Sequence, residues 1–312
     1  MASERTALRT AAAFIVLTMA AALQAYSQQP RPPRPLIIIS EPKATVWIDG
    51  VRYGTTGVDG RLSVRSIAAG PHRIRVRADG FHEVTKPITA AQNGEIAITL
   101  TKTNDPGELA FQEAERLTTV DRAKAAAAYK RAVKLDPKNF DAYIGLARVS
   151  ADAGEFENAV KAIREAKRLR PTSPEAAAVE GRILKETGEE EKAITAFKRG
   201  IAYGKGFQPE AYAGLGLLYK DRAEAAGSEG DFDQEKANYD EASKYLATAV
   251  KQLSGAPDAV VLYQLLGLLY ERQKRYKEAI GIYENFLEEF PDTPEASAVR
   301  SFITQIKKQM GQ

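Results

Sequence analysis

Two segments of the sequence, AAAAYKRAVKLDP (125–137) and AVKAIREAKRLRP (159–171), repeat one pattern 34 residues apart. In each segment an alanine is followed by a large apolar residue, a second alanine and a closing proline at the same offsets. Small residues at fixed positions let two helices approach closely, and large side chains fill the space between successive helix pairs. Proline ends a helix and begins the turn into the next unit. The pattern therefore predicts a stack of helix pairs.

The same offsets return three more times toward the C-terminus, at Ala193, Phe197 and Gly200, at Ala242, Leu246 and Ala249, and at Ala279, Tyr283, Phe286 and Pro291. The preceding segments carry a second set of anchors, at Tyr143 and Leu146, Gly181 and Leu184, Tyr212, Leu215, Gly216 and Tyr219, and Tyr263, Leu266, Gly267 and Tyr270. Together the two sets resemble the tetratricopeptide repeat (TPR). Five copies are predicted over residues 106–292, at 106–139, 140–173, 174–207, 209–256 and 260–292. Residues 293–312 would form a terminal helix that shields the last apolar face.

Two repeats depart from the pattern. The first has Gln112 and Glu113 where a leucine and a small residue are expected, which predicts an irregular cap. In the fourth, Tyr219 and Ala242 are 14 residues further apart than their equivalents elsewhere, or about two extra turns in each helix. A projecting hairpin with its tip at 223–235 is expected, either as a contact surface or as a tolerated insertion. The acids in this tip do not form a calcium loop, because Lys236 occupies the glycine position.

Residues 36–103 have an apolar period of two and contain Asp-Gly pairs typical of tight turns, which predicts a small β-sandwich. ATVWIDGVRYGTT (44–56) and AAGPHRIRVRADGF (68–81) resemble the PEGA domain of bacterial envelope proteins. TGVDGRLSVRSIAAG (56–70) is similar to the related carboxypeptidase-regulatory-like sandwich. The chain departs from the PEGA pattern at EPKA (41–44) and at Gly57, where a proline is usual. The resemblance implies an adaptor module without chemistry.

The fold class is therefore multidomain and mainly α, with a small all-β sandwich followed by an α-helical TPR solenoid. Residues 1–27 have the basic start, apolar run and small-residue end of a signal peptide, with cleavage after Ser27 and Ala25 as an alternative position. A retained signal anchor is the alternative. Residues 28–35, QQPRPPRP, are predicted to be a proline-rich spacer. These features predict an exported protein, periplasmic or envelope-associated, with no membrane span after signal cleavage.

A basic stripe marks the β module, whose residues 28–103 carry 11 basic and 6 acidic residues in a chain of net charge +3. Arg73, Arg75 and Arg77 alternate with apolar residues, and Arg61 and Arg65 extend the same pattern. A solvated sheet face is the favoured interpretation. The alternative is an anionic surface, either an envelope polyanion or cell-wall glycan or the protein's own repeats. Nucleic acid is not expected, because no aromatic residues interleave with the arginines on this strand.

Catalysis is not expected, because the sequence lacks a phosphate-binding loop, a zinc-ligand pattern and a nucleophile elbow. The only two histidines, His72 and His82, are predicted to be exposed turn residues. No cofactor or metal is predicted. Without cysteine the chain can form no disulfide.

The expected function is that of a scaffold or adaptor which binds a peptide or protein partner in the concave groove of the repeats, as the TPR resemblance implies. The predicted groove residues are Ile144, Arg148, Arg182, Lys185, Leu217, Lys220, Gln264 and Leu268. Because the middle of this set is basic, a partner with acidic and apolar residues is expected. A further alternative is a solute-binding role at the junction of the sandwich and the solenoid. The sequence names neither the partner nor the oligomeric state.

Overall fold

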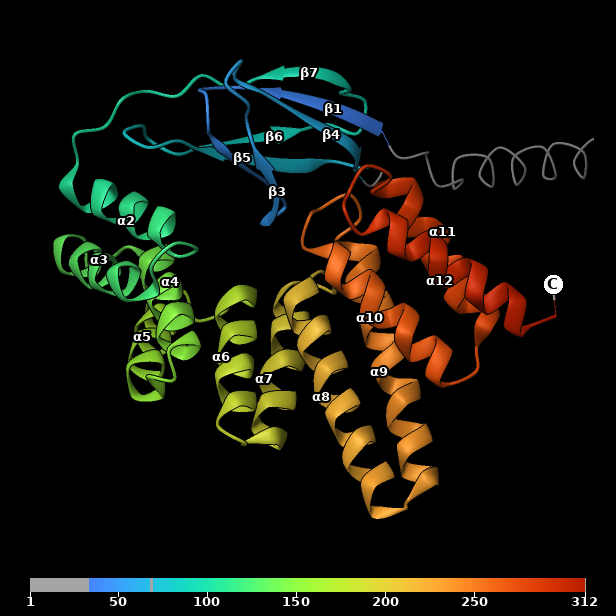
Figure 1. Ribbon diagram of the computed structural model, residues 1–312. Coiled ribbons are helices and arrows are strands. Elements are labelled where there is room, and N and C mark those ends of the chain that lie inside the picture. The colour runs from blue at the N-terminus through green and yellow to red at the C-terminus, as the bar shows by residue number, and fades with distance from the viewer. Residues whose placement is uncertain (1–33, 68–69, 312) are drawn as a thin grey trace, which may run out of the picture.

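A computed structural model describes residues 34–67 and 70–311 (Figure 1). The predicted signal peptide and residues 28–33 of the predicted spacer lie outside the described residues. The last two spacer residues belong to the first strand, which begins at Arg34 and includes Pro35. A proline is tolerated there because it lies at the start of the strand, before the pairing with β7 begins at Leu36.

Two sheets pack face to face in the N-terminal domain. The first has the order β4-β1-β7, with β4 (Arg61–Ile67), β1 (Arg34–Ile39) and β7 (Gly94–Ala97). The second has the order β3-β2-β5-β6, with β3 (Val51–Thr55), β2 (Thr45–Ile48), β5 (His72–Arg77) and β6 (Val84–Ile88). Alternate residues of both sheets, such as Ile38, Val46 and Ile74, form one buried core. The expected small sandwich is confirmed.

Eleven helices follow in the described chain, and ten of them form five antiparallel pairs. The pairs are α2 (Pro106–Leu117) with α3 (Arg122–Leu135), α4 (Phe140–Asp152) with α5 (Phe156–Leu169), α6 (Pro174–Glu186) with α7 (Glu190–Tyr203), α8 (Pro209–Glu229) with α9 (Phe232–Gln252), and α10 (Ala259–Arg272) with α11 (Tyr276–Glu289). The last helix, α12 (Ala296–Gln309), buries Val299, Ile303 and Ile306 against the final pair. This is the predicted TPR-like solenoid.

The glycines of the repeat pattern let an aromatic ring of the second helix lie against the first helix. A Cβ on Gly181 would lie 2.6 Å from the Phe197 ring, and one on Gly267 would lie 2.2 Å from the Tyr283 ring. Phe197 and Tyr283 are among the largest fully buried side chains. Glycine is required at these helix positions for close approach, although it lowers helix propensity.

The fourth pair consists of two helices of 21 residues each, where the other paired helices have 12 to 14. They extend beyond the ends of the neighbouring helices (Figure 1). Gly230 ends α8 with φ of 82°, and the Asp231 side chain caps α9 by accepting from the N–H of Gln234. The turn is therefore confined to Gly230 and Asp231, and most of the segment 223–235 is helical.

The sandwich lies across the open side of the curved solenoid, with contacts at both ends of the arc (Figure 1). It faces α2 and α4 at one end and the α9–α10 connection at the other. None of the helices within the described residues could cross a membrane.

Candidate functional site

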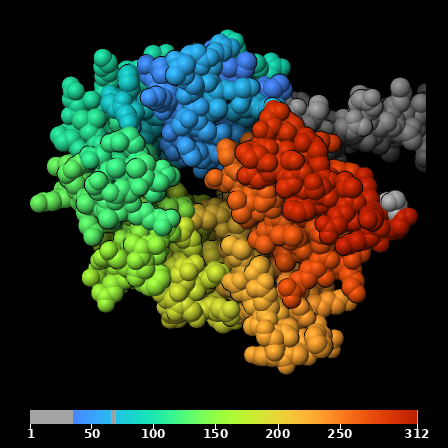
Figure 2. Space-filling view, viewed as in Figure 1, coloured from blue at the N-terminus to red at the C-terminus, as the bar shows by residue number. Residues whose placement is uncertain are grey.

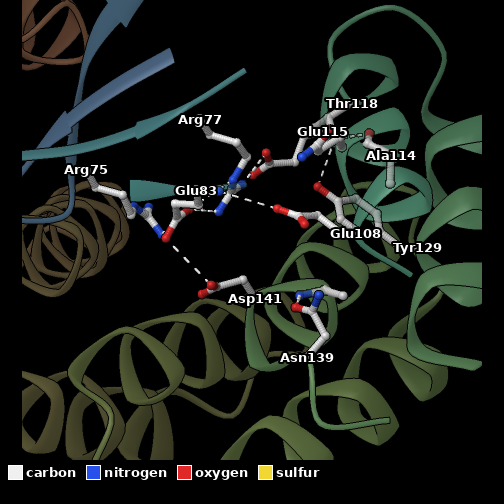
Figure 3. A network of polar contacts seen from close by, with 12 residues as sticks. Arg75, Arg77, Glu83, Glu108, Ala114, Glu115, Thr118, Tyr129, Asn139 and Asp141 are labelled. Carbon is white, nitrogen blue, oxygen red and sulfur yellow. Dashed lines mark hydrogen bonds and ion pairs between the residues drawn. The ribbon is translucent and has the colours of Figure 1, made fainter. Parts of the chain in front are cut away.

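Arg77 joins the sandwich to the first repeat. Its side chain is only 6% exposed and forms ion pairs with Glu83 of the sandwich and Glu115 of α2 (Figure 3). The guanidinium also lies over the Phe111 ring of α2, 4.4 Å from its centroid, and near the Trp47 ring. Burial lowers the pKa of Arg77, but Glu115 and Glu83 outweigh it and raise the pKa above its ordinary value. The group is fixed as a cation.

Gln112 is the second anchor at this boundary. Its side chain accepts the N–H of Gly80 at Oε1 and donates from Nε2 to the carbonyl of Phe81, both at 2.8 Å. The residue is 3% exposed. The departure from the repeat pattern at Gln112 is therefore explained, because this helix position faces the sandwich rather than another helix.

The outer face of the second sheet points toward the solenoid. Arg52, Trp47, Arg75 and Thr85 lie in register on adjacent strands and share that face. Arg75 stacks on Trp47 at 4.4 Å and reaches Asp141 of α4 at 3.9 Å (Figure 3). The aromatic residue that the β5 sequence lacks is thus supplied by β2.

The contact at the other end of the arc is smaller. The Tyr53 hydroxyl donates to the carbonyl of Ser254 at 2.9 Å, and Val51 packs into the core around α9 and α10. Arg65 forms an ion pair with Asp292, and both side chains are largely exposed. Exposed pairs of this kind contribute little. Tyr53 and Val51 therefore supply most of this contact.

A cavity of about 680 Å³ lies between these two contacts. Its roof is the β2–β3 turn (49–52), and its floor is formed where α4, α6, α8 and α10 begin. Phe207, Ala213 and Leu262 supply apolar surface. The space-filling view is hollowed where the sandwich faces the middle repeats (Figure 2). The volume is in the range of ligand pockets.

Arg148 is the central cation of this cavity. Its two terminal nitrogens donate to the two carboxylate oxygens of Glu210 at 2.6 Å each, and one of them reaches Glu175 at 3.3 Å. Burial lowers the pKa of Arg148, whereas Glu210 and Glu175 raise it, and the net shift is upward. Arg148 is thus already occupied by carboxylates of the neighbouring repeats.

The other predicted groove cations are also paired within the chain. Arg182 binds Asp152, Lys185 lies 3.1 Å from Asp221, and Lys220 lies 2.8 Å from Glu224. The expectation of an acidic partner rested on free cations in the middle of the groove, so this pairing removes its basis. The prediction did not consider the acids at the second position of the repeats, Asp141, Glu175 and Glu210, two of which pair with Arg148. Their recurrence at intervals of 34 and 35 residues could have revealed them.

The apolar groove residues differ in accessibility. Ile144 is 3% exposed and packs in the core of the first repeats, so it cannot contact a partner as predicted. Leu217 of α8 and Leu268 of α10 are 36% and 53% exposed, and Gln264 is half-buried. Val261, one turn from Gln264 and missed by the sequence argument, is 68% exposed.

The five arginines of the alternative polyanion site do not form one open surface. Arg75 and Arg77 face the solenoid, Arg61 pairs with Glu95, and Arg65 pairs with Asp292. Among the residues described, Arg73 alone of the five has no carboxylate within ion-pair distance. Part of the predicted solvated face is therefore an internal interface with the protein's own repeats.

The histidine prediction is wrong for His72 and incomplete for His82. His72 belongs to β5, is only 10% exposed at its side chain, and lies 2.6 Å from a carboxylate oxygen of Asp49. His82 is half-exposed and lies 2.8 Å from Glu108 of α2. Both are structural contacts, because folding brings each ring beside a carboxylate that is distant in sequence.

Comparison with known families agrees with this architecture. Residues 35–104 match the PEGA domain, and residues 117–174 and 260–300 match two tetratricopeptide repeat families. The chain is a TPR protein with an N-terminal PEGA domain. No curated protein matches it in sequence.

Among solved structures, the chain is similar to MamA, with 27% identity over 60% of this chain and 95% of that one, at a TM-score of 0.39. Yeast Tom70 shares 20% identity over 66% of this chain and 41% of its own, at a TM-score of 0.51. A thermophilic TPR protein in Thermus thermophilus, TTC0263, shares 18% identity over 64% and 98%, at a TM-score of 0.47. The likeness to Tom70 is one of fold.

Proposed function

We propose that this protein is an exported, non-enzymatic scaffold which holds a peptide or protein partner in its TPR groove within a bacterial cell-envelope assembly. TPR repeats support a role in protein–protein interaction. The PEGA domain supports a periplasmic or envelope location. The basic start, apolar run and small-residue end of residues 1–27 support export.

The observation that carries this proposal is the exposed apolar surface on the first helices of the last two pairs. Leu217, Val261 and Leu268 keep 36%, 68% and 53% of their surface exposed, whereas the charged residues beside them are paired. Exposed apolar patches rimmed by polar groups are typical of interaction sites. The sandwich would fix the curvature of the groove by bridging both ends of the arc.

Site-specific photocrosslinking in cells of the source bacterium tests the proposal. A photoreactive side chain at Leu268 should give a discrete protein adduct, and the same group at the exposed Lys198 of α7 should not. Adducts that are equal at both positions, or none at Leu268, would contradict a groove-bound partner. N-terminal sequencing of protein from envelope fractions should find a mature chain that starts after Ser27.

A further inference from the structure

Some of the charged side chains that line the interdomain cavity are neutralised by an ion pair or by water, and others are not. The charged side chains comprise three arginines and four carboxylates: Arg52, Arg148, Arg170, Asp49, Glu175, Glu210 and Asp258. Asp49 is paired with His72 at 2.6 Å. Arg52 and Asp258 are exposed, and Arg170, 59% exposed, lies over the Phe140 ring. Water compensates exposed charges, so these rim residues select a ligand only weakly.

Glu175 is different, because it lies on the cavity floor and its charge is only partly neutralised by Arg148. Arg148 gives Glu210 two short hydrogen bonds and gives Glu175 one contact of 3.3 Å. Two carboxylates thus share one guanidinium, which leaves a net negative charge. Glu175 is in the first turn of α6, where the helix N-terminus compensates only part of that charge.

Two further charges act on Glu175, Arg75 and Asp141, and they oppose each other. The Glu175 side chain lines the cavity and is 46% exposed, so it is less exposed than Arg170 and remains accessible to a ligand. Desolvation raises the pKa of Glu175 above its ordinary value, Arg148 opposes the shift, and Glu210 adds to it. A second cation at this carboxylate would therefore be stabilising.

We propose that the cavity receives a lysine or arginine side chain from a partner peptide, with the cationic group on Glu175 and flanking apolar residues against Ala213 and Leu262. This inference rests on the proposed function and reverses the acidic partner expected from the sequence. The β2–β3 turn covers the bound segment, so the PEGA domain is part of the site. The proposed ligand is a basic–apolar segment of a protein.

The test uses the full-length mature protein and two synthetic peptides, acetyl-Ala-Leu-Lys-Leu-Ala-amide and its lysine-to-glutamate counterpart. Calorimetric titration should show binding of the lysine peptide at least about tenfold tighter than the glutamate peptide. Trp47, the single tryptophan, lies in register with Arg52 and gives a fluorescence signal for the same titration.

Glu175→Gln should weaken binding of the lysine peptide about ten- to hundredfold, because a charge-assisted contact is lost. Glu186→Gln is the matched control, since it is the same change at an exposed position on the same helix. It should leave the affinity within about twofold. Arg148 keeps Glu210 in the Glu175→Gln variant, so we expect a folded protein, which thermal unfolding checks.

Three outcomes would overturn the inference: tighter binding of the glutamate peptide, equal loss in both variants, or no binding of either peptide. A dimer by light scattering that blocks the lysine peptide would assign the cavity to a second copy, and would also overturn it.

If Leu268 still crosslinks to a partner while the peptides fail, the groove function stands and the cavity assignment alone is wrong. If the lysine peptide binds but Leu268 captures nothing in cells, the scaffold function is wrong.

Discussion

Arg77 of strand β5 and Glu115 of helix α2 form an ion pair across the boundary between the PEGA domain and the first repeat. The two residues are 38 positions apart in sequence, and the arginine is almost completely buried. A buried cation held between two carboxylates and two aromatic rings has few alternative positions. The contact therefore fixes the orientation of the sandwich on the solenoid.

Arg77→Ala should lower the free energy of unfolding by about 2–4 kcal/mol, since it leaves Glu83 and Glu115 without their shared cation. Urea unfolding followed by circular dichroism gives the value. Arg73→Ala, an exposed change on the same strand, should cost less than about 0.5 kcal/mol. Similar values for the two variants would show that the interdomain pair does not stabilise the protein.

Gln112→Ala should cost about 1–3 kcal/mol, because it leaves the N–H of Gly80 and the carbonyl of Phe81 without their partner. Hydrogen exchange at residues 80–81 should accelerate in the variant. Gln234→Ala on the exposed start of α9 should change neither the free energy of unfolding nor the exchange at residues 80–81. Unchanged exchange at Gly80 in the Gln112 variant would contradict the assigned hydrogen bond.

Gly267→Ala should destabilise the last repeats by about 1–3 kcal/mol, because the new Cβ would lie 2.2 Å from the buried Tyr283 ring. Gly281→Ala in the neighbouring helix meets no atom within 4 Å and should stabilise by about 0.5–1 kcal/mol. Thermal unfolding of the two variants compares a close-packed helical glycine with an open one. If both substitutions lowered the stability, or both raised it, close packing of Gly267 against Tyr283 would be contradicted.

Tyr53 connects stability to alkaline pH. Burial, followed by Asp49 and Glu289, raises the pKa of Tyr53 from 10.0 to about 12. The unfolded chain loses this proton near pH 10 and the folded chain near pH 12. The raised pKa of Tyr53 therefore stabilises the folded protein fully below pH 10, and this stabilisation is lost as the pH rises toward 12.

Tyr53→Phe should cost about 1 kcal/mol at neutral pH through the lost bond to Ser254, and should flatten the fall in stability between pH 10 and 12. Urea unfolding at a series of pH values measures both effects. Tyr203→Phe, a change at an exposed tyrosine, is the control. Parallel pH curves for wild type and Tyr53→Phe would contradict the raised pKa.

The repeats and the sandwich could be predicted because their signals are local. Three such signals are the 34-residue spacing, the packing of small residues against large ones in a helix pair, and the period-two pattern of the strands. Each depends only on neighbours within one element or one helix pair. Even the long fourth pair followed from a count of residues. Burial of Ile144 was missed because the repeat pattern gives the helix face but not which neighbour covers it.

The pairing of charges could not be predicted in the same way. Arg148 meets Glu210, 62 residues away, and Arg77 meets Glu115 only because the sandwich lies over α2. Electrostatic partners depend on distances of a few ångströms between elements, and no such distance can be read from the order of residues along the chain.

The sequence by itself determined the two kinds of domain, the number of repeats and the extended fourth pair, since each is a periodic property of the chain. Only the tertiary structure decided what the arginine stripe does. PHRIRVRADG (71–80) reads as a solvated or polyanion-binding face, yet Arg75 and Arg77 lie against the protein's own repeats. The physical reason is that a strand specifies which side chains share a face, whereas the domain that packs on that face determines whether their charges meet water or carboxylates.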